Sequence, residues 1–403
     1  MEVKLGYKQT EVGVIPEEWE VFPFQEVTEI ITCGLAATPT YVPESVGKPF
    51  LSAQNVRNGR VVLDNHRFIP VELFEQITRH NKPRRGDLLY TRVGAGIGEA
   101  GIVETDVEFG IYVSLTLIRT DSRRLHNGFA AHLLNSTSYR ARAKGGQFAG
   151  GGVQNLNVEV VRKFPIPLPS SEEQRAIATV LSDVDGLLGG QDRLIAKRRD
   201  LKQAAMQQLL AGKTRLPGFQ EGWEAKRLGE LIQRLRKTNR PSSAGRTEGK
   251  YPFFTNSTKP CDKYLDEFDF NTEAIIANTG GEAYFNYFNG AFAAMADCFV
   301  FESRIVTRFL YFALKVIEQR INDTGFTGSG IKHLDKKYFA DIELALPPTA
   351  AEQTAIAEVL TDMDAELAAL EQRREKTRAL KQAMMQELLT GRTRLVNTQK
   401  ATA

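Results

Sequence analysis

The sequence has few of the residues that build metal centres or disulfide frameworks. It contains only three cysteines, Cys33, Cys261 and Cys298, and no two of them have a short metal-type spacing. An odd number of distant cysteines favours free thiols in a reducing compartment. The histidines form no pair at metal-ligand spacing, so the sequence predicts neither a zinc site nor a hydrolase site of that kind. They are His66, His80, His126, His132 and His333.

Long hydrophobic runs are also absent. No stretch of about 18 apolar residues exists, which excludes a transmembrane helix. The first six residues, Met1-Glu-Val-Lys-Leu-Gly, lack the apolar core of a signal peptide, so we expect a cytoplasmic protein without a membrane partner. The 52 basic and 49 acidic residues give a formal net charge of only +3. Nucleic-acid binding would therefore need clustered cations.

Recognisable catalytic motifs are missing as well. The glycines of Gly94-Ala-Gly-Ile-Gly98 do not match a dinucleotide fingerprint, and no helix pattern follows them. Gly245-Arg-Thr-Glu-Gly-Lys250 is one residue short of a P-loop and lacks its Ser or Thr. Asp183 and Asp185 stand at an expected helix start, where carboxylates complement the helix dipole. The sequence therefore favours a binding protein over an enzyme.

The chain contains an internal repeat. Residues 174–216 match residues 353–395 at 23 of 43 positions, with an offset of 179. The only two tryptophans, Trp19 and Trp223, each open a more variable segment that precedes one of these copies. At 403 residues the chain should hold two or three domains, since roughly 150 residues are typical of one. The repeat predicts the order variable segment, helix region, variable segment, helix region.

The repeated regions predict helices. Ser171-Glu-Glu-Gln174 and Thr349-Ala-Ala-Glu352 are capping-box patterns, and Ser182-Asp-Val-Asp185 is a second possible start. We therefore expect a short helix that turns into a longer one, at about 183–210 and again at 362–389. Gly212 and Gly391 follow the predicted ends. Heptad-spaced leucines suggest that the two long helices pack together, although Arg198, Arg374 and Thr377 weaken that apolar seam and three glycines, at 186, 189 and 190, weaken the first helix.

The variable segments predict α+β domains. Short β-type runs, such as Asp87–Arg92 and Ala274–Asn278, are bounded by turn residues. Phe129–Arg142 and Thr307–Arg320 have the apolar spacing of helices. The aromatic run Tyr284, Phe285, Tyr287 and Phe288 fits either core packing, which we favour, or a stacking platform for single strands.

Basic and amide side chains suggest DNA binding. One cationic cluster lies in the first variable segment and a second opens the other; each also fits an ordinary solvated surface. Asn and Gln suit adenine in the major groove, and Arg suits guanine. The prediction depends on polar residues that recur in equivalent loops with different identities. The clusters comprise Arg79, Lys82, Arg84, Arg85 and Arg92, and then Lys226, Arg227, Arg234, Arg236, Lys237, Arg240 and Arg246.

The complete set of candidate DNA contacts covers both variable segments. In the first they are Gln54, Asn55, Arg57, Arg84, Arg85, Thr91, Arg92, Gln147, Gln154 and Asn155. In the second they are Thr255, Asn256, Ser257, Lys259, Asn278, Thr279, Lys332 and His333.

The sequence resembles the specificity subunits of type I restriction–modification enzymes. The resemblance covers essentially the whole chain and depends mainly on the stretches 168–216 and 346–395, which share Leu-Pro, Glu-Gln-x-x-Ile-Ala, Leu-Lys-Gln and Thr-Arg-Leu. Gly13-Val-Ile-Pro-Glu-Glu-Trp-Glu20 and Gly86–Gly94 also look like this family. The resemblance implies two target recognition domains, each reading half of a bipartite duplex DNA site, and antiparallel spacer helices in a pseudo-twofold tandem repeat.

The resemblance also implies partners that carry the catalysis. Two methyltransferase subunits with S-adenosylmethionine would dock on the helices, and restriction subunits with ATP and Mg²⁺ would complete the complex. This chain itself would need no cofactor and no metal. Candidate spacer and docking residues are Leu187, Leu194, Leu201, Met206, Leu209, Leu367, Leu370, Leu380, Met385 and Leu388.

The expected boundaries follow from the repeat. Target recognition domains are expected at 1–169 and 213–347, spacer helix regions at 170–212 and 348–392, and a tail at 393–403. Two alternatives remain open. One is a stand-alone binder of single strands or RNA, and the other is a self-sufficient DNA-modifying enzyme without a recognisable site.

Overall fold

The computed structural model describes residues 4–150, 153–328, 330 and 332–396. The chain divides into two compact units. Unit 1 comprises Met1–Gln191 with Arg373–Ala403, and unit 2 comprises Asp192–Gln372. Each unit therefore contains one variable segment and one half of each repeated helix. The predicted fold class, mixed α/β segments in tandem with long helices, is confirmed.

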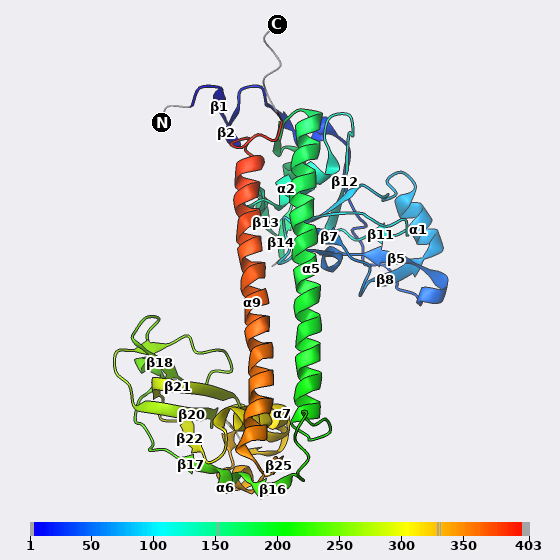
Figure 1. The fold of residues 1–403 in the computed structure, drawn as a ribbon. Helices are drawn as coiled ribbons and strands as arrows, with labels where there is room; N and C mark the ends of the chain where they lie inside the picture. Colours follow the sequence, from blue (N-terminus) through cyan, green and yellow to red (C-terminus); the bar gives the residue numbers. More distant parts are fainter. Residues whose placement is uncertain (1–3, 151–152, 329, 331, 397–403) are drawn as a thin grey trace. The chain divides into compact units, whose positions relative to one another are not determined.

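The repeated regions form two long helices, α5 (Ser171–Leu209) and α9 (Ala350–Leu388), of 39 residues each (Figure 1). At a rise of about 1.5 Å per residue, each is about 58 Å long. Both are continuous, so the prediction of a short helix turning into a longer one is wrong. Ser182 does not cap a new helix, because its Oγ is hydrogen-bonded to Nε2 of His132 at 3.2 Å. Among the described residues, no helix is long and apolar enough to cross a membrane.

The caps at the helix starts follow the repeat. The amide of Glu173 donates to Ser170 Oγ at 3.2 Å, and the amide of Glu352 donates to Thr349 Oγ1 at 3.4 Å. The prediction of Thr349 is confirmed, but in the first copy the cap is Ser170 and not Ser171. The offset of 179 relates Ser170 to Thr349, so the repeat itself identifies the correct residue.

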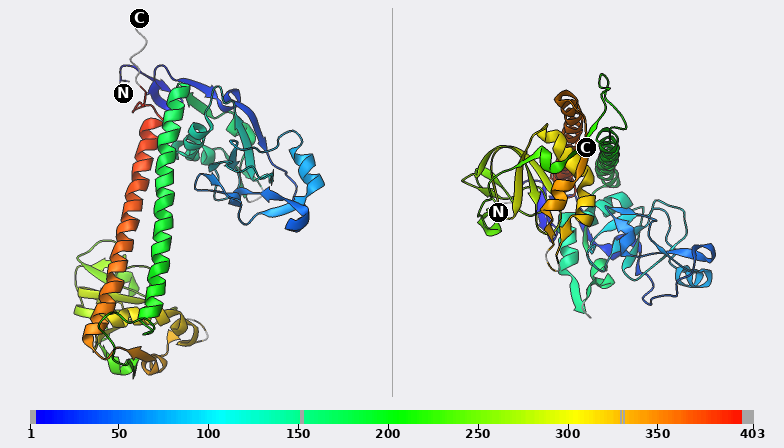
Figure 2. Two further views of the ribbon diagram at one scale, coloured as in Figure 1. Left: turned by 45° about the vertical axis from the view of Figure 1, so that its right-hand side comes forward. Right: turned by 90° about the horizontal axis from the view of Figure 1, so that it is seen from below.

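Within each unit, the two helix halves lie side by side and antiparallel (Figure 1 and Figure 2). In unit 1, Lys381 pairs with Asp185 at 2.6 Å, and the side-chain Nε2 of Gln191 donates to Thr377 Oγ1 at 3.2 Å. In unit 2, Arg198 pairs with Glu366 at 3.0 Å, and Lys202 pairs with Asp364. Polar contacts therefore form much of the seam, in agreement with the weak leucine pattern.

Unit 1 is built around a six-stranded sheet of order β4-β12-β9-β10-β7-β6 and a three-stranded sheet of order β11-β5-β8. Three two-stranded pairs, β1-β2, β13-β14 and β15-β3, accompany them. The strands are β1 (Tyr7–Thr10), β2 (Gly13–Pro16), β3 (Glu20–Pro23), β4 (Thr28–Cys33), β5 (Gly47–Leu51), β6 (Val56–Arg57), β7 (Arg60–Val61), β8 (Arg67–Pro70), β9 (Leu88–Thr91), β10 (Ala100–Ile102), β11 (Gly110–Ile111), β12 (Leu115–Thr120), β13 (Gln147–Gly150), β14 (Val153–Leu156) and β15 (Pro165–Leu168). The helices are α1 (Val71–Thr78), α2 (Asn127–Asn135), α3 (Thr137–Gly145) and α4 (Val158–Arg162).

Unit 2 has one six-stranded sheet of order β17-β22-β20-β21-β18-β19 and the pairs β16-β25 and β23-β24. The strands are β16 (Glu224–Arg227), β17 (Ile232–Arg234), β18 (Tyr251–Phe254), β19 (Tyr264–Leu265), β20 (Phe270–Asn278), β21 (Phe285–Ala294), β22 (Cys298–Ser303), β23 (Phe326–Thr327), β24 (His333–Leu334) and β25 (Glu343–Leu346). The helices are α6 (Leu228–Leu231), α7 (Thr307–Thr324) and α8 (Lys336–Asp341).

The six-stranded sheets of the two units share one layout. In both, an edge strand (β4 or β17) lies beside the strand that comes last in the sequence (β12 or β22), and a central antiparallel hairpin follows (β9-β10 or β20-β21). A small hairpin (β13-β14 or β23-β24) then follows the helices that cover the sheet. The duplication that is obvious in the helices therefore extends through segments whose sequences have diverged.

The aromatic run of unit 2 is part of its core. Phe285 is buried with Phe301, Phe309 and Phe339, and Phe288 packs with its neighbours Phe254 and Phe292 on the other side of the sheet. Core packing, the favoured interpretation, is confirmed for Phe285 and Phe288. Tyr284 and Tyr287 are half-buried, and their rings lie under Lys315 and Arg308.

A buried ion pair anchors each helix start. In unit 1, Arg394 contacts Glu173 through two hydrogen bonds of 2.6 and 2.7 Å, and Trp19 Nε1 donates to the same carboxylate at 3.2 Å. In unit 2, Arg215 and Trp223 contact Glu352 in the same way. Because Glu173 is fully buried, this pair fixes the helix on the domain only while both partners are present.

Candidate nucleic-acid interface

The candidate interface of each unit lies where a central strand ends beside a small hairpin. In unit 1, β9 ends at Thr91, Val93 forms a β-bridge with Asn155, and the amide of Leu156 donates to Arg92 O at 2.8 Å. The hairpin β13-β14 is thereby joined to the strand end. This arrangement brings the predicted residues 91–92 and 155 together.

Unit 2 repeats this arrangement with different side chains. There β20 ends at Asn278, Gly280 forms a β-bridge with His333, and the amide of Leu334 donates to Thr279 O at 2.9 Å. The amide of Gly281 also donates to Lys332 O at 2.9 Å. The predicted correspondence between Thr91-Arg92 and Asn278-Thr279 is therefore visible in the backbone contacts of both units.

Arg92 supports this site from below the surface. Its Nε donates to Leu156 O at 2.9 Å, one terminal nitrogen donates to Val113 O at 3.2 Å, and the other donates to Asn155 Oδ1 at 2.9 Å. The residue is only 8% exposed. In this structure the guanidinium of Arg92 holds the hairpin on the strand end, and a DNA contact by Arg92 stays a prediction.

Asn55 has a similar structural role. Its Oδ1 accepts from the amide of Ser52 at 3.0 Å, and its Nδ2 donates to Val62 O and Asp64 O at 3.1 and 2.8 Å. The side chain is fully buried and has no edge to offer to a base. Asn55 therefore fixes the loop that presents its exposed neighbours.

Thr91 and Asn278 are also buried, at 0% and 1% exposure. The Oγ1 of Thr91 and the Oδ1 of Asn278 have no hydrogen-bond partner among the described residues, while Nδ2 of Asn278 donates to Ser257 O at 3.2 Å. Both side chains are covered by the protein in this structure, and their contacts with DNA stay predictions.

Three further predicted contacts of unit 1, at Gln54, Arg57 and Asn155, lie at the surface. Gln54 is exposed and donates to Asn65 O at 2.6 Å, and the exposed Arg57 pairs with Asp64. Asn155 is exposed beside Arg92, its Oδ1 accepting the hydrogen bond described above. The side chains of Gln147 and Gln154 lie outside the described residues.

The basic cluster of unit 1 is partly neutralised. Arg85 forms a two-bond pair with Asp106 at 2.9 and 2.7 Å, and Lys82 pairs with Glu108. The hydrogen bonds from Arg85 lower the pKa of the Asp106 carboxyl. Within the described ranges, Arg84 has no acidic partner for its exposed side chain. Arg84 is therefore a better phosphate candidate than Arg85.

In unit 2, most predicted contacts gather near the strand end. The Oγ of Ser257 accepts from the amide of Lys259 at 3.1 Å, and Thr279 donates to Asp297 O. The amide of Asn256 is directed at Met295 Sδ, at 3.3 Å. Thr255, Asn256 and Ser257 are partly exposed, whereas Lys259, Lys332 and His333 are exposed.

The predicted docking residues divide into two groups. Leu187 and Leu380 in unit 1, and Leu194 and Leu201 in unit 2, are between 41% and 57% exposed, and Leu367 and Leu370 are half-buried. The others are buried in the core of their own unit, where they attach the helix to the domain. These are Met206 and Leu209 in unit 2, and Met385 and Leu388 in unit 1.

Sequence reasoning missed the residues that position the helices. Glu173 and Glu352, and likewise Arg215 and Arg394, are related by the offset of 179. Oppositely charged residues that recur together in a duplicated region are a detectable signal of a repeated ion pair. Across the described part of the chain, no group of three or more His, Cys, Asp and Glu side chains could hold a metal ion.

Comparison with known proteins gives a consistent result. The family model of the type I restriction modification DNA specificity domain matches residues 16–194 and again residues 220–379. A Methanocaldococcus jannaschii protein assigned as the MjaX specificity subunit of a type I restriction enzyme is 25% identical over 423 residues, covering 97% of both chains. The EcoDI specificity subunit of Escherichia coli is 31% identical over 169 residues, covering 42% of this chain and 37% of that protein.

The fold has relatives among solved structures. The crystal structure of a type I restriction–modification system S subunit from M. genitalium matches with a TM-score of 0.65 at 16% identity. The match covers 96% of this chain and 98% of that one, so the whole fold is shared.

Proposed function

Since the chain belongs to the family of type I restriction–modification DNA specificity domains, we propose that each unit reads one half of a bipartite duplex DNA site. The observation that carries this proposal is the duplicated strand end with its hairpin. The two copies have the same backbone contacts, Val93 with Asn155 and Gly280 with His333, but different exposed side chains. Two units with the same backbone arrangement but different exposed polar side chains can read two different half-sites.

The side chains at the surface give each unit its candidate readers. In unit 1 they are the exposed Gln54, Arg57 and Asn155, and in unit 2 they are the partly exposed Asn256 and the exposed Lys332. Amide groups pair with adenine and basic groups with guanine in the major groove, and a good contact is worth about 1–3 kcal/mol of discrimination. Arg92 and Asn55 support these readers from beneath.

The chain is the non-catalytic specificity component of its system. We propose that two methyltransferase subunits dock on the exposed leucines of α5 and α9, because the repeat supplies one such helix pair per unit. S-adenosylmethionine would be bound by those subunits, and ATP and Mg²⁺ by restriction subunits. A mass measurement of the assembled complex should give two methyltransferase chains per specificity chain, and a single chain would contradict this arrangement.

Selection of bound duplexes from a random-sequence pool tests the two-reader proposal. The full chain, assembled with its methyltransferase, should select a bipartite motif. Combined Gln54→Ala and Arg57→Ala should relax one half, and combined Asn256→Ala and Lys332→Ala the other. Gln203→Ala, at an exposed position on α5, is the control and should select the wild-type motif.

Two outcomes would contradict the proposal. If the unit 1 variant relaxes both halves equally, the units are not separate readers. If the wild-type complex binds single-stranded DNA or RNA of the same sequence as tightly as the duplex, the chain is a general nucleic-acid binder.

A further inference from the structure

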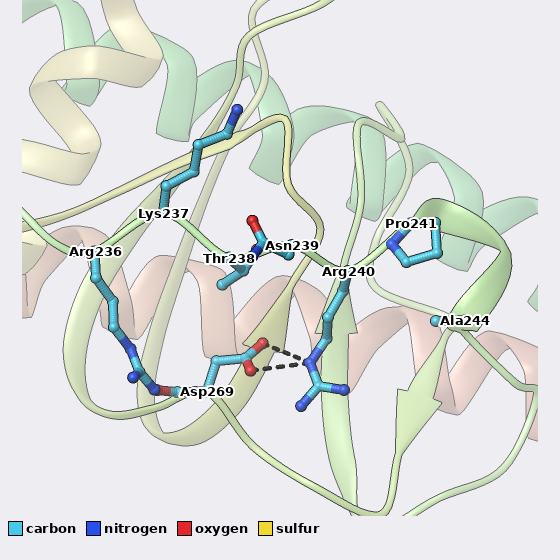
Figure 3. Close-up of a pocket in the computed structure, with 8 residues that line it drawn as sticks. All are labelled: Arg236, Lys237, Thr238, Asn239, Arg240, Pro241, Ala244 and Asp269. Atoms are coloured by element: carbon cyan, nitrogen blue, oxygen red, sulfur yellow. Dashed lines mark hydrogen bonds and ion pairs between the residues drawn. The ribbon is translucent and has the colours of Figure 1, made fainter.

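A hollow of about 400 Å³ opens on unit 2 beside its edge strand β17. It is lined mainly by the segment 236–241, which follows that strand, and by Asp269 from the turn before β20. Figure 3 shows Arg236 and Arg240 pointing toward Asp269, while Lys237 points away from it. Three cations and one carboxylate line the hollow, so its charge is positive.

The segment is held in place at three points. A terminal nitrogen of Arg236 donates to Asp269 O at 2.9 Å, and Thr238 Oγ1 donates to Ala294 O at 2.6 Å. Nε of Arg240 lies 2.9 Å from both carboxylate oxygens of Asp269. These bonds fix the backbone before any ligand arrives, which lowers the entropy cost of binding.

The fixed segment leaves two cationic groups available. Within the described residues, Lys237 has no acidic partner, and the contact of Arg236 is to a backbone carbonyl, so neither charge is neutralised. The side chain of Asn239, which also lines the hollow, is exposed and could donate from its amide. Arg240 and Asp269, by contrast, neutralise each other and serve as the support.

The hollow adjoins the candidate readers of the same unit. The turn that follows β21 supports both: Ala294 O accepts from Thr238 and the amide of Ala296 donates to Arg240 O, while Met295 Sδ accepts from the amide of Asn256. A strand of DNA on the reader loops would therefore pass next to the cations.

The equivalent place in unit 1 has different chemistry. A smaller hollow of about 190 Å³ lies at the end of the corresponding edge strand β4, and no charged residue lines it. The connection 34–46 that follows β4 has no Lys or Arg, whereas the connection 235–250 that follows β17 has five. The duplicated scaffold has thus become cationic at this place in unit 2 alone.

We propose that the segment 236–240 is a DNA-backbone contact that unit 1 lacks at the equivalent place, with Arg236 and Lys237 donating to phosphates and Arg240 and Asp269 holding the segment. This inference rests on the proposed function, since it assigns part of the affinity of that same interface. Because Arg236 and Lys237 point to different sides of the segment, they suit successive phosphates of a strand better than one free phosphate ion (Figure 3).

The test is the salt dependence of duplex binding by the full chain in its methyltransferase complex. Each phosphate contact contributes a slope of about 0.9 in log affinity against log salt concentration. Combined Arg236→Ala and Lys237→Ala should therefore lower the slope by about 1.8. Between about 50 and 200 mM salt, wild-type affinity should fall about 12-fold more than that of the variant.

The control removes the same charge elsewhere in unit 2. Lys213→Ala with Arg304→Ala removes two exposed cations, one past the end of α5 and one just after the Ser303 end of β22, and should leave the slope unchanged. An unchanged slope in the Arg236 and Lys237 variant, or an equal drop in the control, would overturn the inference. Competition by inorganic phosphate at matched ionic strength would also overturn it, by showing a site for the free anion.

These outcomes are separable from the proposed function. In the selection assay, the Arg236 and Lys237 variant should keep the wild-type motif in both halves, because phosphate contacts carry no direct sequence information. A wild-type complex that shows no salt-dependent duplex binding at all would refute the proposed function itself. Normal wild-type binding with an unaffected variant would refute this inference alone.

Discussion

Acid should destabilise unit 1 through one buried histidine. His132 lies on α2 with a side chain only 10% exposed, and its Nδ1 is 3.9 Å from a carboxylate oxygen of Asp185. Burial and, to a smaller extent, the nearby Lys381 ammonium lower the pKa of His132 to about 4, although Asp185 opposes the change. The ring is therefore neutral in the folded unit at neutral pH.

The sign of the effect follows from the two pKa values. The unfolded chain has the ordinary histidine pKa of 6.5, so between about pH 6.5 and 4 it binds a proton that the folded unit does not. The free energy of unfolding is fully preserved above pH 6.5 and falls as the pH falls. From the two pKa values, the loss from His132 between about pH 7.5 and 5 is about 2 kcal/mol.

The second unit supplies the variant that tests this reasoning. The backbone amide of His126 donates to Gln174, and that of Val306 donates to Gln353, the same glutamine in the second copy, so His126 and Val306 are equivalent. Six residues further along each helix, the position of His132 is therefore occupied by Phe312, whose ring lies under Lys202. His132→Phe should therefore fit and should remove the acid sensitivity. Relative to wild type, the variant should gain about 2 kcal/mol on going from about pH 7.5 to 5.

The two tryptophans allow unit 1 to be observed alone. In a Trp223→Phe background, the fluorescence of the buried Trp19 reports denaturant unfolding of unit 1. His80→Gln, at an exposed position of the same unit, is the control and should follow the wild-type pH dependence. If the stability difference between His132→Phe and wild type is the same at both pH values, the reasoning is refuted.

Two further predictions concern the helices. Arg394→Ala should lower the unfolding free energy of unit 1 by about 3 kcal/mol in the same fluorescence assay, because it leaves the buried Glu173 unpaired. The control Arg392→Ala, at an exposed position, should change the unfolding free energy by less than about 0.5 kcal/mol. Equal effects of the two variants would exclude a special role for the Arg394 and Glu173 pair. Insertion of one heptad after Gln191 and another after Gln372 lengthens both helices by about 10 Å, which corresponds to about three base pairs of DNA. The preferred spacing between half-sites should therefore increase, or the affinity for DNA should be lost. Selection from a random-spacer library measures this, and full affinity with an unchanged spacing would show that the helices do not set the distance.

Several features of this protein were determined by the sequence alone. The repeat predicted two units and two helix regions, because closely related sequences in one chain adopt the same structure. The short β-type runs ending at Arg92 and Asn278 became β9 and β20, as turn residues bound them on both sides. The motifs at 168–216 and 346–395 indicated the family, and the family model matches both halves of the chain.

Local patterns did not determine which polar residues face outward. Arg92 and Asn55 have the chemistry of base readers, but Arg and Asn also satisfy backbone carbonyls, and here they hold a hairpin and a loop. Sequence position gives no information on burial in a loop, because no periodic pattern exists there. Their exposed neighbours, such as Gln54, became the candidates only once the packing was known.

Contacts between distant residues were decided by the tertiary structure alone. Arg394 and Glu173 are 221 positions apart, and the cationic hollow requires Arg240 to meet Asp269 from another strand connection. The continuity of α5 through Gly186 and Gly190 likewise goes against local propensity. The helix packs on the core of unit 1 before the glycines, at Leu181, and contacts α9 on either side of them through Asp185 and Gln191. Local propensity disfavours helical glycine by about 1 kcal/mol each, and tertiary burial outweighs this cost because the apolar face of a helix gains more when it packs on a core.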